Sequence, residues 1–155
     1  MALDAMREDL IVGVVGAGAM GRGIAQVAAV GGCLVKLYDA KEGEAAEAQA
    51  FVRKMLDRNV EKGRMAQEDA EDAAARIEVI NSMSGFVGSQ CIIEAVVENL
   101  DVKHVVFKEL ESIVADNCVI ATNTSSLSVS AIASACEKPE RVAGLHFFNP
   151  VPLMK

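Results

Sequence analysis

The chain has 155 residues, of which 52% are hydrophobic and 24% are charged, and its formal net charge is −7. This composition is typical of one globular domain that buries a substantial core, and it excludes an intrinsically disordered chain. The acidic balance disfavours a nucleic-acid-binding protein, which needs a basic face. The sequence has no apolar run of the roughly 18 residues that a membrane span needs, and its N-terminal segment lacks the apolar centre of a signal peptide.

Residues 10–30 predict a strand, a tight turn and a helix in succession. The apolar, β-branched run 10–15 is typical of a buried strand, and the apolar spacing of the residues that follow the turn is typical of a helix. Between them the glycines stand in the G-x-G-x-x-G spacing of dinucleotide-binding proteins, where they make the turn, admit a pyrophosphate and let the helix pack closely. We therefore expect cofactor contacts from Gly16, Ala17, Gly18, Ala19, Met20 and Gly21.

The segment 33–38 predicts a second strand, and Asp39 follows it, 18 residues after Gly21. In dinucleotide-binding folds an acidic residue about 20 residues beyond the glycines hydrogen-bonds the adenosine ribose. A carboxylate at this position also repels the 2′-phosphate of NADP, so the sequence favours NAD. Asp39 could equally cap a turn or a helix, and the two roles are compatible.

The rest of the chain predicts alternating helices and strands. A charged, alanine-rich helical stretch fills 41–76, and Gly63 divides it into a long helix and a shorter one. Further strands are predicted at 77–80, 91–97, 118–121 and 142–148, and a helix at 101–115 with Val102, Val105, Val106, Leu110 and Ile113 on its apolar side. Strands that alternate with helices form a parallel sheet. The predicted fold class is therefore α/β, a Rossmann-type, doubly wound and mainly parallel sheet with a helical insertion after its second strand.

Polar residues stand near the ends of three predicted strands, at the edge where α/β sheets bind ligands. Glu98 follows strand 91–97, and five small polar residues at 122–126 suit either a turn with a helix cap or a hydroxyl-binding site. His146 lies within strand 142–148, where a histidine is usually a satisfied core residue. The Asn-Pro pair that ends this strand could instead turn His146 toward the crevice, where an imidazole suits proton transfer near neutral pH. We interpret the other histidine, His104, as a surface residue.

A basic stripe interrupts the acidic character of the long helix. Lys54, Arg58 and Lys62 recur at every fourth position and share one helix face. The stripe is either a solvated face balanced by neighbouring acids or a landing site for a phosphorylated ligand, and its spacing alone favours the solvated face.

The four cysteines, Cys33, Cys91, Cys118 and Cys136, show neither metal-ligand spacing nor a disulfide framework. Because three of them lie in or beside apolar runs, we expect buried free thiols, no bound metal and a reducing compartment, the cytoplasm.

Four motifs in this order resemble the L-3-hydroxyacyl-CoA dehydrogenases: GAGAMGRGIAQ, EAVVENLDVK, TNTSSLS and GLHFFNPVPLMK. The resemblance covers residues 11–155 and is strongest toward bacterial-type 3-hydroxybutyryl-CoA dehydrogenases. It implies an enzyme that interconverts an L-3-hydroxyacyl-CoA and a 3-oxoacyl-CoA with NAD.

The resemblance also implies roles for single residues. His146 matches the catalytic base, Ser125 the residue that hydrogen-bonds the reacting oxygen, and Asn149 a residue that positions substrate and cofactor. Glu98 and Lys103 match cofactor-contacting positions. Lys62 falls where the family has a lysine that reaches coenzyme A, which favours the ligand-binding interpretation of the basic stripe.

One departure from the family concerns the end of the sequence. The family pairs its catalytic histidine with a glutamate about a dozen residues later, and here the sequence ends at Lys155. We therefore expect residues 1–155 to be an NAD-binding domain without the helical domain through which the family forms homodimers. Such a chain would bind NAD(H) and turn over little substrate. The alternatives are an NAD enzyme of the β-hydroxyacid dehydrogenase type and a non-catalytic redox sensor.

Overall fold

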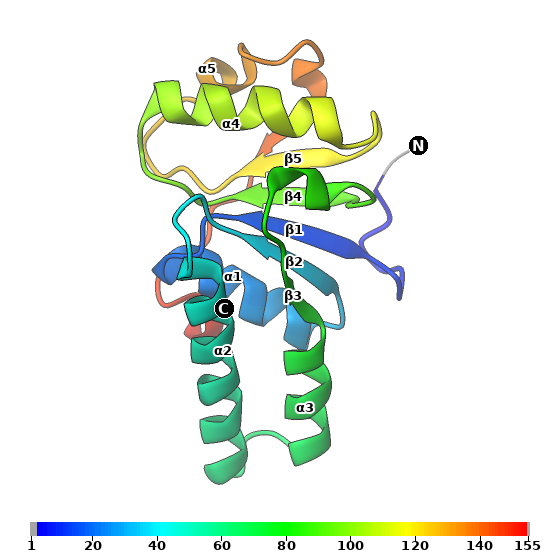
Figure 1. Ribbon diagram of the computed structural model, residues 1–155, viewed down its shortest axis with the longest axis vertical. Coiled ribbons are helices and arrows are strands. Elements are labelled where there is room, and N and C mark those ends of the chain that lie inside the picture. The colour runs from blue at the N-terminus through cyan, green and yellow to red at the C-terminus, as the bar shows by residue number, and fades with distance from the viewer. Residues whose placement is uncertain (1–2, 155) are drawn as a thin grey trace.

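A computed structural model describes residues 3–154, so residues 1, 2 and 155 of the expected domain lie outside the described part. Six strands form one parallel sheet in the order β3-β2-β1-β4-β5-β6 (Figure 1). The strands are β1 (Ile11–Val15), β2 (Leu34–Tyr38), β3 (Ile77–Val79), β4 (Cys91–Glu94), β5 (Val119–Thr122) and β6 (Val142–Gly144). The predicted Rossmann-type sheet is confirmed, and every pair of its neighbouring strands is parallel.

Helices cover both faces of this sheet (Figure 1). One face carries α1 (Ala19–Val30), α2 (Glu44–Glu61) and α3 (Gln67–Ala75), and the other carries α4 (Leu100–Ile113) and α5 (Val129–Ala133). Three short 3₁₀ helices complete the chain: η1 (Met83–Phe86), η2 (Pro139–Arg141) and η3 (Val151–Leu153). Because both faces are covered, the central strands are apolar along their length rather than alternating, as the sequence of β1 shows.

Two apolar clusters form the core, one on each side of the sheet. On the α1 side, Val14 and Leu37 pack with residues of α1 and α2. On the α4 side, Ile92 and Ile120 pack with Phe107 of α4. The sheet is therefore buried between the two helical layers.

The strand order reverses direction between β1 and β4, which are neighbours in the sheet. From β1 the chain first builds outward through β2 and β3, and then crosses back to β4 and continues through β5 and β6. In open α/β sheets the crevice at such a reversal, beyond the carboxyl ends of the strands, is where ligands bind.

Helices α2 and α3 form the predicted insertion, a hairpin that projects beyond the sheet (Figure 1). Gly63 lies between them with a φ of +66°, in the left-handed region that glycine adopts without a steric penalty. The predicted division of 41–76 at this glycine is confirmed.

Two predicted strands end earlier than expected. The strand predicted at 91–97 ends at Glu94, so Glu98 lies four residues beyond the sheet and does not close the strand. The strand predicted at 142–148 ends at Gly144, so His146 lies in the segment that follows it. In both places the apolar run continues after the chain has left the sheet to line a cavity described below, which is why composition alone extended the strands.

The predicted apolar side of α4 is confirmed in part, since Leu110 is buried and Val106 and Ile113 pack against the core. Val102 and Val105 are 41% and 65% exposed, whereas Lys103, Phe107 and Leu110 are buried. Lys103 also faces the interior, where it pairs with a buried carboxylate described below. His104 is half-buried rather than a surface residue, and its Nε2 lies 2.6 Å from the carbonyl oxygen of Ala131.

Within residues 3–154, no helix is long and apolar enough to cross a membrane. The four cysteines are free thiols, as predicted, and Cys91 and Cys118 are buried while Cys33 and Cys136 are half-buried.

Candidate functional site

The glycine turn joins β1 to α1 at the point of reversal. Gly16 has a φ of +98°, and its N–H donates to the carbonyl of Tyr38 at 2.8 Å. A side chain on Gly21 would collide with the carbonyl oxygen of Gly16, which explains why helix and turn can lie this close only with glycine there. A side chain on Gly18 would meet no atom within 4 Å, so the turn leaves open space on that side.

That open space lies at the N-terminus of α1 and fits a pyrophosphate. Gly18 caps the helix without a side-chain hydrogen bond, and the first turn of the helix carries no acidic residue. The first N–H groups of a helix have no partner within it and carry partial positive charge, so they attract phosphate. The residues present therefore fit the phosphates of a dinucleotide.

Asp39 stands directly after β2 and borders the glycine turn. Its Oδ2 accepts a hydrogen bond from the Ala17 N–H at 2.8 Å, and its Oδ1 accepts one from the Lys41 N–H at 2.8 Å. The turn-capping role considered for Asp39 is therefore present in the structure. The same bonds hold the carboxylate on the β2 side of the turn, where an adenosine ribose lies in dinucleotide-binding folds.

On the other side of the turn, a cavity of about 270 Å³ opens at the carboxyl edge of β4 and β5. It brings together six of the predicted site residues, most of them distant in sequence. Its lining is Met20, Ala95, Val96, Glu98, Lys103, Asn123, Ser125, His146, Phe147, Phe148 and Asn149. The predicted catalytic residues Ser125, His146 and Asn149 thus share one cavity with Glu98 and Lys103.

The segment that carries His146 is tied to the loop that carries Ser125. The side-chain oxygen of Asn123 accepts a hydrogen bond from the Phe147 N–H at 2.8 Å. The His146 ring is exposed and lies against Phe148, with 4.8 Å between ring centroids. Within residues 3–154, no carboxylate contacts the imidazole of His146. The sequence places Asn123 only within a polar run, because its link to Phe147 depends on the tertiary fold.

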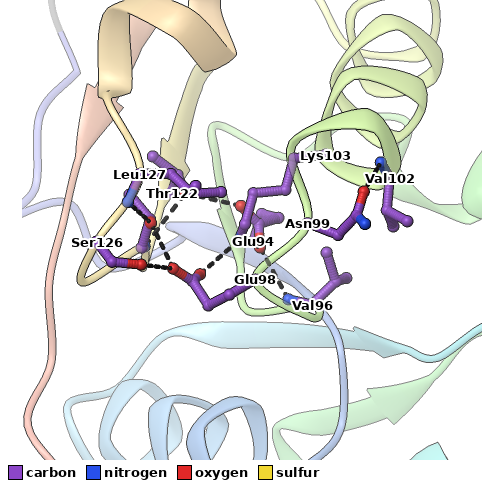
Figure 2. A network of polar contacts seen from close by, with 10 residues as sticks. Glu94, Val96, Glu98, Asn99, Val102, Lys103, Thr122, Ser126 and Leu127 are labelled. Atoms are coloured by element: carbon purple, nitrogen blue, oxygen red, sulfur yellow. Dashed lines mark hydrogen bonds and ion pairs between the residues drawn. The ribbon is translucent and has the colours of Figure 1, made fainter.

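A buried ion pair lies behind this cavity (Figure 2). The Glu94 side chain is 0% exposed and the Lys103 side chain 1%, and the Lys103 Nζ donates to Glu94 Oε2 at 2.6 Å. Sequence reasoning treated Glu94 as part of an apolar strand and missed it. The signal that could have found it is a carboxylate inside an apolar run, since burial of a charge requires a partner.

Lys103 also lies 3.1 Å from Glu98 Oε1, so its ammonium is held between two carboxylates. Burial opposes ionisation of Glu98. Hydrogen bonds from Thr124, Lys103 and Ser126, with the charge of Lys103, outweigh burial and hold the pKa of Glu98 below its usual value. Glu98 is therefore a stable carboxylate at the cavity, with its side chain 40% exposed.

A second and larger cavity, of about 960 Å³, is lined by α1, by α2 and the residues that follow it, and by the C-terminal segment 146–154. His146, Phe147, Phe148 and Asn149 line both cavities, so this segment is the wall between them. Four cations line the larger cavity: Arg22, Arg58, Lys62 and Arg64. Lys54, the first residue of the basic stripe, is exposed but does not line it.

The α1 and α2 walls of the larger cavity are joined by a stacking contact. The guanidinium carbon of Arg22 lies 3.7 Å from the centroid of the Phe51 ring. Such a cation–π contact fixes the position of an arginine that would otherwise move freely. The cavity thus has a positively charged lining on a partly apolar surface.

Comparison with known proteins identifies the family. Residues 11–155 match the family model described as "3-hydroxyacyl-CoA dehydrogenase, NAD binding domain". A probable 3-hydroxybutyryl-CoA dehydrogenase of Bacillus subtilis is 39% identical over 142 residues, which are 92% of this chain and 50% of that relative.

Two solved structures agree with the sequence comparison. The crystal structure of (S)-3-hydroxybutyryl-CoA dehydrogenase from Ralstonia eutropha aligns with a TM-score of 0.89 and 40% identity, over 93% of this chain and 51% of that one. A 3-hydroxybutyryl-CoA dehydrogenase from Escherichia coli K12 aligns with a TM-score of 0.92 and 39% identity, over 95% and 31%. The chain spans about half the length of the first curated relative. With a family model that matches most of its residues, the chain belongs to the 3-hydroxyacyl-CoA dehydrogenase family, as an NAD-binding domain whose cofactor is NAD.

Proposed function

We propose that the chain is the NAD-binding part of an oxidoreductase that interconverts an L-3-hydroxyacyl-CoA and a 3-oxoacyl-CoA. The observation that carries this proposal is the cavity in which Ser125, His146 and Asn149 meet beside the glycine turn. A base, a hydroxyl and an amide around one cavity are the groups that alcohol oxidation needs. Membership of the family and the names of its relatives support the same substrate class.

In this proposal His146 takes the proton of the substrate hydroxyl during oxidation and returns it during reduction. The Ser125 hydroxyl donates a hydrogen bond to the reacting oxygen and stabilises the charge that develops there. NAD, when bound, accepts or supplies the hydride, so the protein's own task is orientation and proton transfer. Asn149 orients substrate and cofactor from the segment that separates the two cavities.

The cofactor would contact residues on both sides of the point of reversal. On one side, Asp39 and the turn from Gly16 to Gly21 bind the adenosine ribose and the pyrophosphate. On the other, Glu98 and Lys103 lie at the nicotinamide end, where both line the cavity. A dinucleotide laid across the turn spans the two sides.

Coenzyme A would occupy the larger cavity. Its phosphates require cations, and Lys62 stands there with Arg22, Arg58 and Arg64. Because the larger cavity shares the His146–Asn149 wall with the smaller one, an acyl chain attached there could reach the proton-transferring group.

Three predictions about the wider setting of the chain belong with this proposal. Residues 1–155 alone would bind NAD(H) and turn over little substrate, because the His146 imidazole is exposed and lacks an orienting carboxylate in the described part. A homodimer through a further helical domain would be the working form. Free thiols at all four cysteines suit a reducing compartment such as the cytoplasm.

The test is acetoacetyl-CoA-dependent oxidation of NADH by a chain extended to the length of its relatives. We expect His146→Gln to lower kcat by at least about 100-fold, the usual contribution of a general acid or base. The chain's other histidine supplies a matched control, since His104 contacts Ala131 and lines neither cavity. His104→Gln should keep kcat within about twofold of the unchanged chain, because it leaves the proton-transferring group in place.

A non-catalytic redox sensor is the remaining alternative, because a family match leaves open whether this member retains activity. Such a sensor would keep its NADH response after His146→Gln and would show no acetoacetyl-CoA-dependent oxidation before it. The β-hydroxyacid dehydrogenase type receives no support from the family match.

A further inference from the structure

The most deeply buried carboxylate of the site belongs to Glu94, which has no role in the proposed reaction. Glu94 is the last residue of β4, beside the point of reversal, and its side chain is 0% exposed. Burying a carboxylate is unfavourable unless hydrogen bonds and a counter-charge replace the lost water. A charge retained at this depth therefore needs a structural explanation.

Three donors surround the Glu94 carboxylate (Figure 2). Lys103 Nζ donates to Oε2 at 2.6 Å, and the Val96 N–H donates to the same oxygen at 2.8 Å. The Thr122 hydroxyl donates to Oε1 at 2.7 Å. Glu94 thus joins the end of its own strand to α4 and to the end of β5.

The first branch from Glu94 runs through Lys103 to the cavity. The Lys103 Nζ lies 3.1 Å from Glu98 Oε1. Glu98 Oε2 accepts hydrogen bonds from the hydroxyls of Thr124 at 2.7 Å and Ser126 at 2.9 Å. These two residues flank Ser125 in the sequence, so the branch ends on both sides of the predicted catalytic residue.

The second branch runs through Thr122 to the same loop. The Thr122 hydroxyl, which donates to Glu94, accepts a hydrogen bond from the Thr124 N–H at 3.2 Å. The Ser125 loop is therefore held twice from one buried carboxylate, once through its side chains and once through its backbone.

We propose that Glu94 is a positioning residue that holds Glu98 and the Ser125 loop in place for the nicotinamide half of NAD. The inference rests on the proposed function, which assigns that half to this cavity. Asp39 and the glycine turn serve the adenosine half, and within residues 3–154 no hydrogen bond or ion pair joins Asp39 to the Glu94 network. Loss of the Glu94 charge leaves Glu98 as the single carboxylate partner of the Lys103 ammonium, which draws Glu98 away from Thr124 and Ser126.

The test compares two ligands with the 155-residue chain: NADH, and ADP-ribose, which lacks the nicotinamide. For Glu94→Gln we expect the dissociation constant of NADH, from a fluorescence titration, to rise about tenfold. The dissociation constant of ADP-ribose, from calorimetry, should stay within about twofold, because its contacts lie on the Asp39 side.

Glu111→Gln is the matched control. Glu111 also accepts two backbone hydrogen bonds, from Glu137 and Lys138, and lies 3.7 Å from the buried Arg141, but at the opposite edge of the sheet. The Glu111→Gln variant should have a lower melting temperature and unchanged affinities for both ligands. If Glu94→Gln fails to fold, Thr122→Val cuts the second branch alone and should weaken NADH binding about threefold with ADP-ribose unaffected.

Any of four results would overturn the inference. Unchanged NADH affinity in a folded Glu94→Gln chain would remove any positioning role. An equal loss of affinity for both ligands in Glu94→Gln, or the same loss of affinity in Glu111→Gln, would show that Glu94 contributes only to the stability of the fold. No NADH binding by the unchanged chain would overturn the proposed function as well, which separates that failure from one confined to Glu94.

Discussion

Among single residues, Lys62 allows the clearest test of whether an exposed charge contacts a ligand. It belongs to the same basic stripe as Lys54, and both side chains are exposed, but only Lys62 lines the larger cavity. We expect Lys62→Ala to raise the dissociation constant of coenzyme A about tenfold, or ~1.4 kcal/mol. Binding of NADH should not change, because Lys62 lines the cavity proposed for coenzyme A and is not a proposed cofactor contact. Calorimetric titration of both ligands into the 155-residue chain measures this.

Lys54→Ala is the control for that experiment. It removes the same charge from the same helix without touching the cavity, so a general electrostatic effect on an anionic ligand would appear in both variants. Equal losses of coenzyme A affinity in Lys54→Ala and Lys62→Ala would show that Lys62 acts through net charge alone. No loss of coenzyme A affinity in either variant would show that the basic stripe is a solvated helix face.

The residues that sequence alone could identify are those whose neighbours in the chain define their setting. Asp39 follows from its distance to the glycines, because strand, turn and helix have fixed lengths. Asn123 could not be identified, because its partner Phe147 is brought close only by the crossover from β5 to β6. Glu94 could be suspected as a carboxylate inside an apolar run, but its pairing with Lys103 of α4 depends on the fold. Tertiary contact, rather than residue type, gives these two side chains their roles.

At the level of elements, strands β4 and β5 protect two thiols. Burial raises the pKa of the Cys91 thiol to about 11 and that of Cys118 to about 12. The thiolate is the reactive form, so these cysteines should resist iodoacetamide at about pH 8 as long as the sheet is intact. Mass spectrometry of the alkylated chain should find label first at the half-buried Cys33 and Cys136. Rapid labelling of Cys91 or Cys118 without denaturant would contradict the buried position of these strands.

Sequence patterns predicted the existence of the strands and their places along the chain well but not where two of them end. The first strand and helix matched closely because the glycine turn marks their boundary in the sequence itself. The predicted ends at 97 and 148 were wrong because apolar residues serve two purposes here, sheet core and cavity lining. The burial of Lys103 on α4 was not predicted, because the buried Glu94 requires a cation and hydrophobic spacing cannot represent that requirement.

For the molecule as a whole, strand order brings the separate motifs to one crevice. The turn after β1, the carboxylate after β2 and the polar loops after β4, β5 and β6 meet at the carboxyl edge of a single parallel sheet (Figure 1). Asp39 lies on the β2 side of the reversal and the His146 cavity on the β4 side. This arrangement fits one dinucleotide laid across the sheet, with its adenosine end beside a carboxylate.

A fluorescence titration of NADH into the 155-residue chain, with NADPH in parallel, tests most directly whether the crevice binds NAD as described. The chain has no tryptophan, which keeps background emission low. NADH should bind at least about tenfold more tightly than NADPH, since a carboxylate after the second strand is expected to repel the 2′-phosphate of NADPH. Equal affinity for the two nucleotides, or no binding of either by a chain whose circular dichroism shows it folded, would contradict the assignment of the cofactor site.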